Sequence, residues 1–151
     1  MTDAPTAHRD LIFMQAFLDL AIPPSTDGKM PGAGSLDIAA EVAGALEADE
    51  LLGPFIQAGL QAVHGAALGR DPAGFSGLSP HARVELVESQ LAAHPFLMPG
   101  LALHLYPSYY QHPRVLEALG EPPRPPFPEG YDVEPTDPQL LDQLRTRKRG
   151  A

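Results

Sequence analysis

Apolar residues recur every three or four positions along most of this chain, a spacing that predicts amphipathic α-helices. No segment alternates apolar and polar residues as a strand does, and no segment repeats internally. Prolines and glycines fall between the periodic segments and predict where helices begin and end. The pattern therefore predicts an all-α fold, an irregular bundle of six to seven short helices with a proline-rich extended C-terminal arm.

Local signals place the expected helices along the chain. The first covers about residues 7–21, and Ile22-Pro23-Pro24 ends it. Ser35 is expected to cap the second helix, with Asp37 in its first turn, after a loop over residues 25–34. Later helices are expected to begin at Pro54, at Pro80 after the cap Ser79, at Pro113 (ending at Leu119), and at Asp137-Pro138 with Leu140, Leu141 and Leu144.

The same spacing predicts which side chains form the core. Each helix is expected to bury one apolar stripe and to turn charged residues such as Glu85 and Glu88 toward solvent. The predicted core residues are Leu11, Phe13, Met14, Phe17, Leu18 and Ala21; Ile38, Val42 and Leu46; Phe55, Ile56, Leu60, Val63, Ala67 and Leu68; and Val84, Val87 and Leu91.

The segment over residues 95–110 differs from the others because it has no clear polar face. Its apolar residues include Phe96, Leu97, Met98, Leu101, Leu103, Leu105 and Tyr106. A helix that is apolar on all sides lies at the centre of a core or is covered by a partner. This segment is therefore one candidate binding surface.

The C-terminal arm is a second candidate. Seven of the chain's 18 prolines lie between Pro122 and Pro138. Proline fixes φ and removes a backbone donor, so the arm is expected to be stiff and extended, with little entropy to lose on docking. Phe127 and Tyr131 would be its aromatic anchors. The expected organisation is a helical domain over 1–120, the arm over 121–136, and a short helix with a basic tail over 137–151.

The composition and charge of the chain argue against several classes of protein. The net charge is −9, and residues 1–144 carry six basic against 19 acidic side chains, which argues against nucleic-acid binding. The basic tail at residues 145–149 is interpreted as a solvated end. The longest apolar run is too short to span a membrane. No signal peptide or twin-arginine motif is seen, so we expect a cytoplasmic protein, and a periplasmic one only if a partner carries the signal.

The sequence offers little chemistry of its own. Cysteine is absent, and none of the six histidines has the spacing of a common metal motif. The acidic cluster from Asp37 to Glu50 is interpreted as a solvated helix face, and no serine-nucleophile motif occurs. We therefore expect no catalytic, cofactor-binding or metal-binding residue. The alternatives are a stand-alone helical enzyme or ligand-binding domain that uses His104, His112 and the tyrosines, or a homo-oligomeric helical protein.

Two blocks of residues resemble a known family. The first is Ala21-Ile22-Pro23-Pro24, then Asp27-Gly28 and Met30-Pro31-Gly32-Ala33, before an apolar helix. The second is Tyr109-Tyr110-x-His112-Pro113 with Leu119-Gly120, then Pro128-x-Gly130-Tyr131. In this order the blocks resemble the gluconate 2-dehydrogenase subunit 3 family over about residues 10–131.

That resemblance implies a binding function. Members are α-helical, cofactor-free small subunits of large FAD-dependent dehydrogenases of the glucose–methanol–choline (GMC) type, which oxidise a sugar or alcohol and commonly pass electrons to a cytochrome c. The small subunit supports folding and export of the large one, often with a twin-arginine signal that is not seen here. The residues that the resemblance and the arm together assign to partner contact are Pro31, Gly32, Tyr109, Tyr110, His112, Pro113, Phe127, Pro128, Gly130 and Tyr131.

Overall fold

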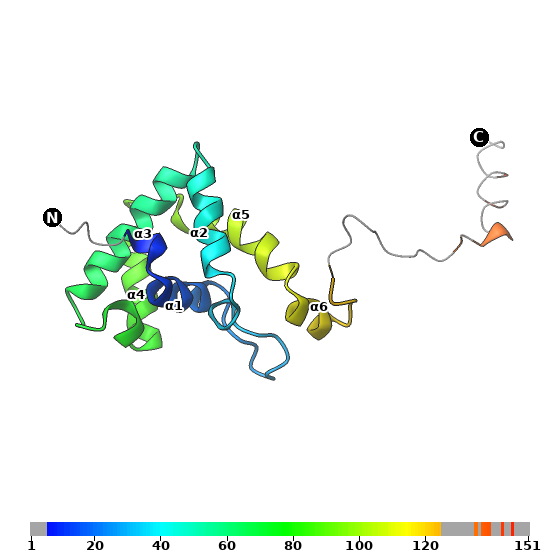
Figure 1. Cartoon of the computed structure of the whole chain (residues 1–151), viewed down its shortest axis with the longest axis horizontal. Helices are drawn as coiled ribbons and strands as arrows, with labels where there is room; N and C mark the ends of the chain where they lie inside the picture. Colours follow the sequence, from blue (N-terminus) through cyan, green and yellow to red (C-terminus); the bar gives the residue numbers. More distant parts are fainter. Residues whose placement is uncertain (1–5, 125–134, 136, 140–142, 144–145, 147–151) are drawn as a thin grey trace.

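The computed structural model describes residues 6–124, 135, 137–139, 143 and 146, and within them all regular structure is helical (Figure 1). This confirms the all-α prediction. The α-helices are α1 (Leu11–Ala21), α2 (Ala39–Ala48), α3 (Gly53–Leu68), α4 (Pro80–Leu91), α5 (Leu97–Tyr110) and α6 (Pro113–Leu119). The 3-10 turn η1 (Ala7–Arg9) precedes α1, while η2 (Ala33–Ser35) and η3 (Gly74–Gly77) lie between α1 and α2 and between α3 and α4. Of the predicted arm over 121–136, residues 125–134 and 136 lie outside the described residues, as do Leu140, Leu141 and Leu144 of the expected last helix.

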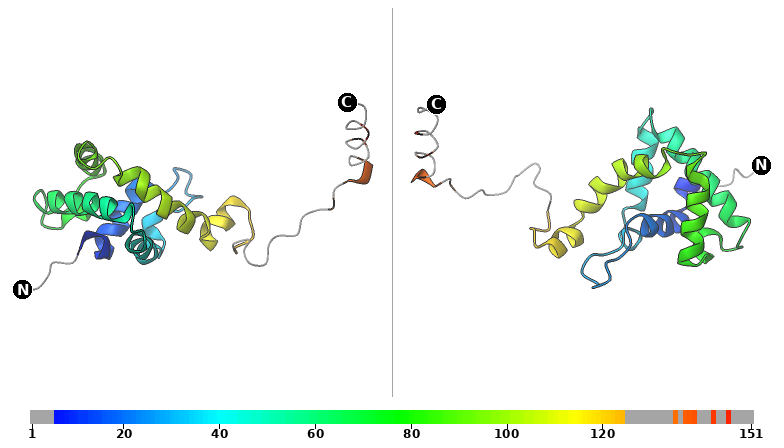
Figure 2. Two further views of the ribbon diagram at one scale, coloured as in Figure 1. Left: turned by 90° about the horizontal axis from the view of Figure 1, so that it is seen from above. Right: turned by 180° about the vertical axis from the view of Figure 1, so that it is seen from behind.

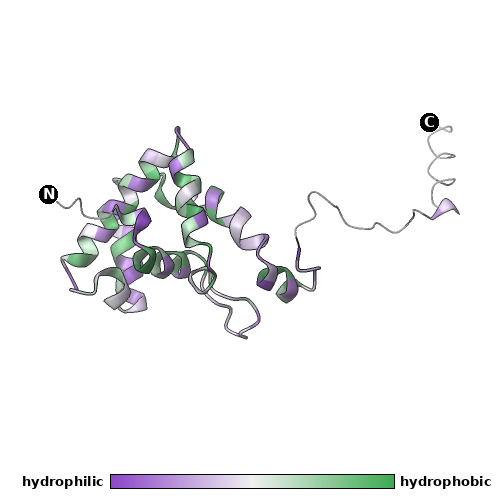
Figure 3. Cartoon of the chain, viewed as in Figure 1, coloured by the Kyte–Doolittle hydropathy of each residue, from purple (hydrophilic) through white to green (hydrophobic). Residues whose placement is uncertain are grey.

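Helix α3 is the centre of the bundle, because α2, α4, α5, η1 and η3 all pack against it. Helix α1 lies against η2 and η3. All views show α5 leading away from this body to α6, which lies at one end of the described helices (Figures 1 and 2). Apolar and polar residues are interspersed along each helix, as expected for amphipathic helices (Figure 3). Helix α6 is thus joined to this body through α5, against which it packs.

Polar caps and prolines fix most of the helix starts. The Asp10 carboxylate accepts hydrogen bonds from the backbone N–H of Ile12 and Phe13, at 3.0 and 3.1 Å. Because this cap stands at residue 10, α1 begins at Leu11, and residues 7–9 form a 3-10 turn instead of the expected first turn of the helix. Ser79 caps α4 as predicted, since its hydroxyl accepts from Ala82 N–H at 3.3 Å.

The prediction that Ser35 caps the second helix was wrong. The Ser35 hydroxyl instead donates to the carbonyl of Gly32, at 2.7 Å, and closes the 3-10 turn η2. Helix α2 begins four residues later at Ala39, after Ile38, which makes no side-chain cap. Asp37 therefore lies before the helix and not in its first turn.

Several predicted core residues are exposed. Leu11, Phe55, Leu68 and Val84 each keep at least 43% of their surface accessible. Phe55 and Leu68 are each next to a fully buried residue of α3, Ile56 and Ala67, and the turn of about 100° per residue carries them out of the core. On α4 the buried pair is Leu86 and Val87. The other predicted stripes are buried as expected: Phe13, Met14, Phe17 and Leu18; Ile38, Val42 and Leu46; and Ile56, Leu60, Val63 and Ala67.

Helix α6 ends at a glycine, as predicted. Gly120 has φ of 80°, a left-handed conformation that glycine adopts without strain. The N–H of Glu121 donates to the carbonyl of Leu116 at 2.8 Å, and Gly120 N–H donates to Glu117 at 3.0 Å, which is a Schellman motif. Among the described residues, no helix is both long and apolar enough to cross a bilayer.

Candidate functional site

The inner face of α5 is part of the core. Leu97, Leu101, Leu105 and Tyr109 are each no more than 1% exposed, and α5 packs on α3 and α2. The approach to α3 is close, since a Cβ added at Gly100 would lie 2.7 Å from Ile56 Cδ1. This face carries the buried contacts that hold α5 against α2 and α3.

The opposite side of α5 is also apolar, but nothing in the described structure covers it. Its exposed residues recur at spacings of three and four from the N-cap residue onward: Phe96, Pro99, Leu103, Tyr106, with the adjacent Pro107, and Tyr110. Leu103 is 62% exposed and Tyr106 51%. No Asp, Glu, Lys or Arg occurs between residues 95 and 110. A surface helix normally turns charged residues to water, and contiguous exposed apolar patches mark interaction sites.

Aromatic contacts extend this patch to Phe55 at one end and link two of its tyrosines at the other. Phe55 of α3 lies 5.8 Å from Phe96, ring centre to ring centre. The Tyr110 ring meets the Tyr106 ring edge-on at 6.0 Å. We call the set formed by Phe55, Phe96, Pro99, Leu103, Tyr106, Pro107 and Tyr110 the α5 face. Its rigid aromatic groups are the residue types that dominate the binding energy of protein interfaces.

A cavity of about 240 Å³ adjoins the α5 face on the side of α1. Two of its lining residues, Pro99 and Tyr106, also belong to the α5 face. The remaining ones are Ala21, Met98, Leu101, Ala102 and Leu105, so no charged side chain lines it. Its size and lining suit a single apolar side chain from another molecule.

Three of the residues predicted to contact a partner have clear roles inside this chain. The Tyr109 hydroxyl donates to the carbonyl of Pro31 at 2.7 Å, and its ring is buried. Burial, with a smaller contribution from the neighbouring Tyr110, raises the pKa of the Tyr109 phenol above its usual 10.0. Gly32 is buried where a Cβ would collide with the Asp19 carboxylate and with Pro24. These residues join the loop after α1 to α5.

The other described candidates lie at the junction of α5 and α6. His112 caps α6, since its Nδ1 accepts from Arg114 N–H at 3.2 Å, and its Nε2 lies 3.4 Å from Asp37 Oδ1. Pro113 is exposed at the first position of α6. Of the predicted residues that the structure describes, Tyr110 alone belongs to the α5 face. Phe127, Pro128, Gly130 and Tyr131 lie outside the described residues.

His104 joins α5 to the end of α2. Its Nε2 lies 3.0 Å from Asp49 Oδ2, while Asp49 Oδ1 accepts from Leu51 and Leu52 N–H, each at 2.9 Å. The hydrogen bond from Leu52 N–H has the largest effect on Asp49 and lowers its pKa below the usual 3.8. The bond from Leu51 N–H and the contact with His104 lower this pKa further. His104 and His112 thus pair with different carboxylates. Within the described residues, no group of three His, Asp or Glu side chains is placed to hold a metal ion.

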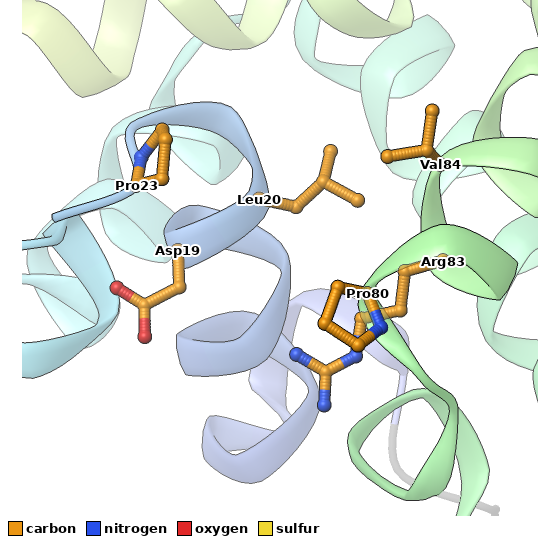
Figure 4. A pocket seen from close by; sticks show the side chains of 6 residues that line it. All are labelled: Asp19, Leu20, Pro23, Pro80, Arg83 and Val84. Carbon is orange, nitrogen blue, oxygen red and sulfur yellow. The ribbon is translucent and has the colours of Figure 1, made fainter. Parts of the chain in front are cut away.

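A second cavity, of about 340 Å³, lies between α1 and α4 (Figure 4). Asp19, Leu20 and Pro23 face Pro80, Arg83 and Val84 across it. Its charged groups already hold neighbouring loops. The Arg83 guanidinium donates to the carbonyls of Phe75 and Ser76 at 2.9 and 2.7 Å, and Asp19 accepts from Gly34 N–H at 2.8 Å. The α5 face is therefore the stronger candidate.

Part of the α5 face was not predicted from the sequence. Phe55 was expected in the core, and Pro99 was not singled out. The 3–4 spacing from Phe96 to Tyr110 was the signal that could have found the stripe, because it recurs alongside a second, inner stripe on the same helix.

Comparison of this chain with protein-family models, with curated proteins and with solved structures found no match in any of the three. The resemblance of its two sequence blocks to a family of small dehydrogenase subunits stays a prediction.

Proposed function

We propose that this chain is a non-catalytic binding subunit, and that the α5 face docks it onto a large FAD-dependent dehydrogenase of the GMC type. One observation carries the docking: exposed apolar residues run the length of α5, and no charged residue occurs between positions 95 and 110. The identity of the partner comes from the resemblance of the two sequence blocks.

Hydrophobic burial would drive this docking. Each square ångström of apolar surface removed from water contributes roughly 25 cal/mol before the costs of association. Permanent complexes bury more than about 2,000 Å² in total, and their interfaces resemble a divided domain core. Exposed aromatic and aliphatic side chains beside an apolar cavity match that composition.

In this proposal the chemistry belongs to the partner. The large subunit would bind FAD and oxidise a sugar or alcohol hydroxyl, and a cytochrome c is a candidate electron acceptor. This chain would stabilise the fold of the large subunit. The complex would be cytoplasmic, or periplasmic if the large subunit carries an export signal.

Affinity purification tests the proposal. The chain is tagged in its native host and purified gently, and the visible spectrum and the masses of all co-eluting chains are recorded. We expect a large chain of the dehydrogenase type and a flavin spectrum. A lone, colourless and cooperatively folded chain would contradict the proposal, and a homodimer would favour the homo-oligomeric alternative.

Site-specific crosslinking tests the surface. A photoreactive amino acid replaces Leu103 on the α5 face, or Glu88 on the outer side of α4 as a matched control, since both positions are exposed. We expect the flavoprotein to be crosslinked from position 103 and not from position 88. Equal yields from the two positions would remove the α5 face from the proposal.

A further inference from the structure

Acidic side chains follow one side of the α5 face. Between residues 30 and 69 the chain has five acidic residues and no Lys or Arg: Asp37, Glu41, Glu47, Asp49 and Glu50. These residues lie on or beside α2, which packs against α5. Residues 84–113, which include all of α5, also lack Lys and Arg.

Direct contacts hold three of these carboxylates alongside α5. Ser108 donates to Glu41 Oε1 at 2.8 Å, and His104 lies 3.0 Å from Asp49. Asp37 lies 3.4 Å from His112, just beyond the end of α5, and its side chain is 97% exposed. We call Asp37, Glu41 and Asp49 the acidic rim. Glu47 is not included because it pairs with Arg9 at 2.7 Å.

The rim runs parallel to the exposed stripe. His104 and Ser108 are four residues apart and therefore lie in one row along the helix, directly above one another. Each residue of an α-helix is rotated by roughly 100° from the one before it. With that rotation, the row of His104 and Ser108 lies next to the exposed stripe that contains Phe96, Leu103 and Pro107. On the opposite border of the stripe lies the uncharged 240 Å³ cavity. The α5 face thus has an acidic edge and an apolar edge.

The spacing of the stripe indicates the shape of what covers it. Alternating steps of three and four residues form the seam along which two helices pack. A helix laid on this seam would bring its own flank close to the acidic rim. A neutral or acidic flank would leave the carboxylates desolvated without a cation, which is costly, whereas a basic flank complements them.

We propose that the partner element that docks on the α5 face is an amphipathic helix with Lys or Arg along the flank that meets the acidic rim. Its apolar stripe packs on the face and inserts one side chain into the adjoining cavity. This inference rests on the proposed function, because it gives the chemistry of the docking surface that function requires.

Synthetic helical peptides test this chemistry directly. Two labelled peptides share one heptad stripe of leucines and differ only in their flanking residues, which are lysine in one and glutamate in the other. Fluorescence anisotropy with the full chain at about 0.05 M salt is expected to give at least tenfold tighter binding of the lysine peptide. That preference should shrink near 1 M salt, where the screening length falls to about 3 Å.

Charge-reversal variants locate the effect. Asp37→Lys in the rim is expected to weaken the lysine peptide about fivefold or more. Glu88→Lys makes the same change of charge on the exposed side of α4 and is expected to have little effect. Leu103→Glu should abolish binding of both peptides. Equal loss from Asp37→Lys and Glu88→Lys would mean attraction by net charge alone and would overturn the inference.

The remaining outcomes separate this inference from the proposed function. The basic-flanked helix is wrong if both peptides bind equally, or if neither binds. The docking role still stands in either case, provided that Leu103→Glu releases the native flavoprotein. If Leu103→Glu leaves the native complex intact, the docking role fails. A salt-sensitive dimer of this chain that Leu103→Glu abolishes would make a second copy the occupant and overturn the inference.

Discussion

Helices α4 and α5 both pack on α3, yet their outer sides have opposite chemistry. The outer side of α4 carries His81 and Glu85, whose side chains lie 3.3 Å apart, and it carries Glu88 one turn later. The outer side of α5 carries only apolar and aromatic residues. Both helices bury an inner stripe, so both serve the fold. From this difference we expect the outer apolar residues of α5 to contribute little to folding.

The largest effect should separate the two sides of α5 itself. Leu101→Ala is expected to lower the free energy of unfolding by about 2–5 kcal/mol, because it leaves a cavity in a packed core. Leu103→Ala should change it by less than about 0.5 kcal/mol, since this side chain is mostly exposed. Urea unfolding measures both. A cost above about 1 kcal/mol for Leu103→Ala would show that the outer side of α5 also contributes to folding.

A second pair of variants tests how closely α5 approaches α3. Gly100→Ala is expected to cost about 1–3 kcal/mol, because the new Cβ would lie 2.7 Å from Ile56 Cδ1 in a buried site. Gly65 lies on α3, and a Cβ added there would have no atom within 4 Å. Gly65→Ala should therefore stabilise the protein by up to about 1 kcal/mol, because alanine favours the helix more than glycine does. Thermal unfolding of the two proteins compares them. Stabilisation by both would mean that Ile56 moves aside and that the inner packing is loose.

The neighbouring tyrosines offer a smaller contrast. Tyr109→Phe removes the hydrogen bond to Pro31 and is expected to cost about 1 kcal/mol of stability. Tyr110→Phe should be neutral, because its ring is half exposed on the α5 face. Chemical unfolding gives both values. If Tyr110→Phe costs more stability than Tyr109→Phe, the Tyr110 hydroxyl has a structural role, and Tyr110 no longer belongs to the proposed binding surface.

Much of the fold could be predicted from local signals. Ser79-Pro80, Gly53-Pro54 and the glycine after Leu119 act through contacts within a few residues, and each marks its helix boundary correctly. Ser35 failed because its hydroxyl had a competing acceptor, the Gly32 carbonyl, only three residues away. Sequence alone does not decide between such local alternatives.

The candidate site was only partly predictable. The all-apolar character of residues 95–110 showed that α5 is either central or covered by a partner. Which residues lie inside depends on where α3 crosses α5, and a crossing is a tertiary property. Tyr109 and Tyr110 are adjacent and chemically identical, yet one is buried and the other half exposed. The acidic rim likewise depends on contacts between residues far apart, such as Glu41 with Ser108.

The last and weakest expected effect is on the pH dependence of stability. It concerns Asp49, which contacts His104 between the inner and outer sides of α5. The bonds from Leu52 and Leu51 N–H, together with His104, hold the pKa of Asp49 in the folded state below its usual 3.8. Its contribution to stability is therefore complete above pH 3.8 and is lost as the pH falls through the lower folded value. Asp49→Asn should make the acid decline in the free energy of unfolding shallower, as measured by urea unfolding below pH 5. Leu103→Ala, which changes no titrating group, should keep the original profile. An unchanged profile in Asp49→Asn would mean that Asp49 does not contribute to acid sensitivity and that other carboxylates cause it.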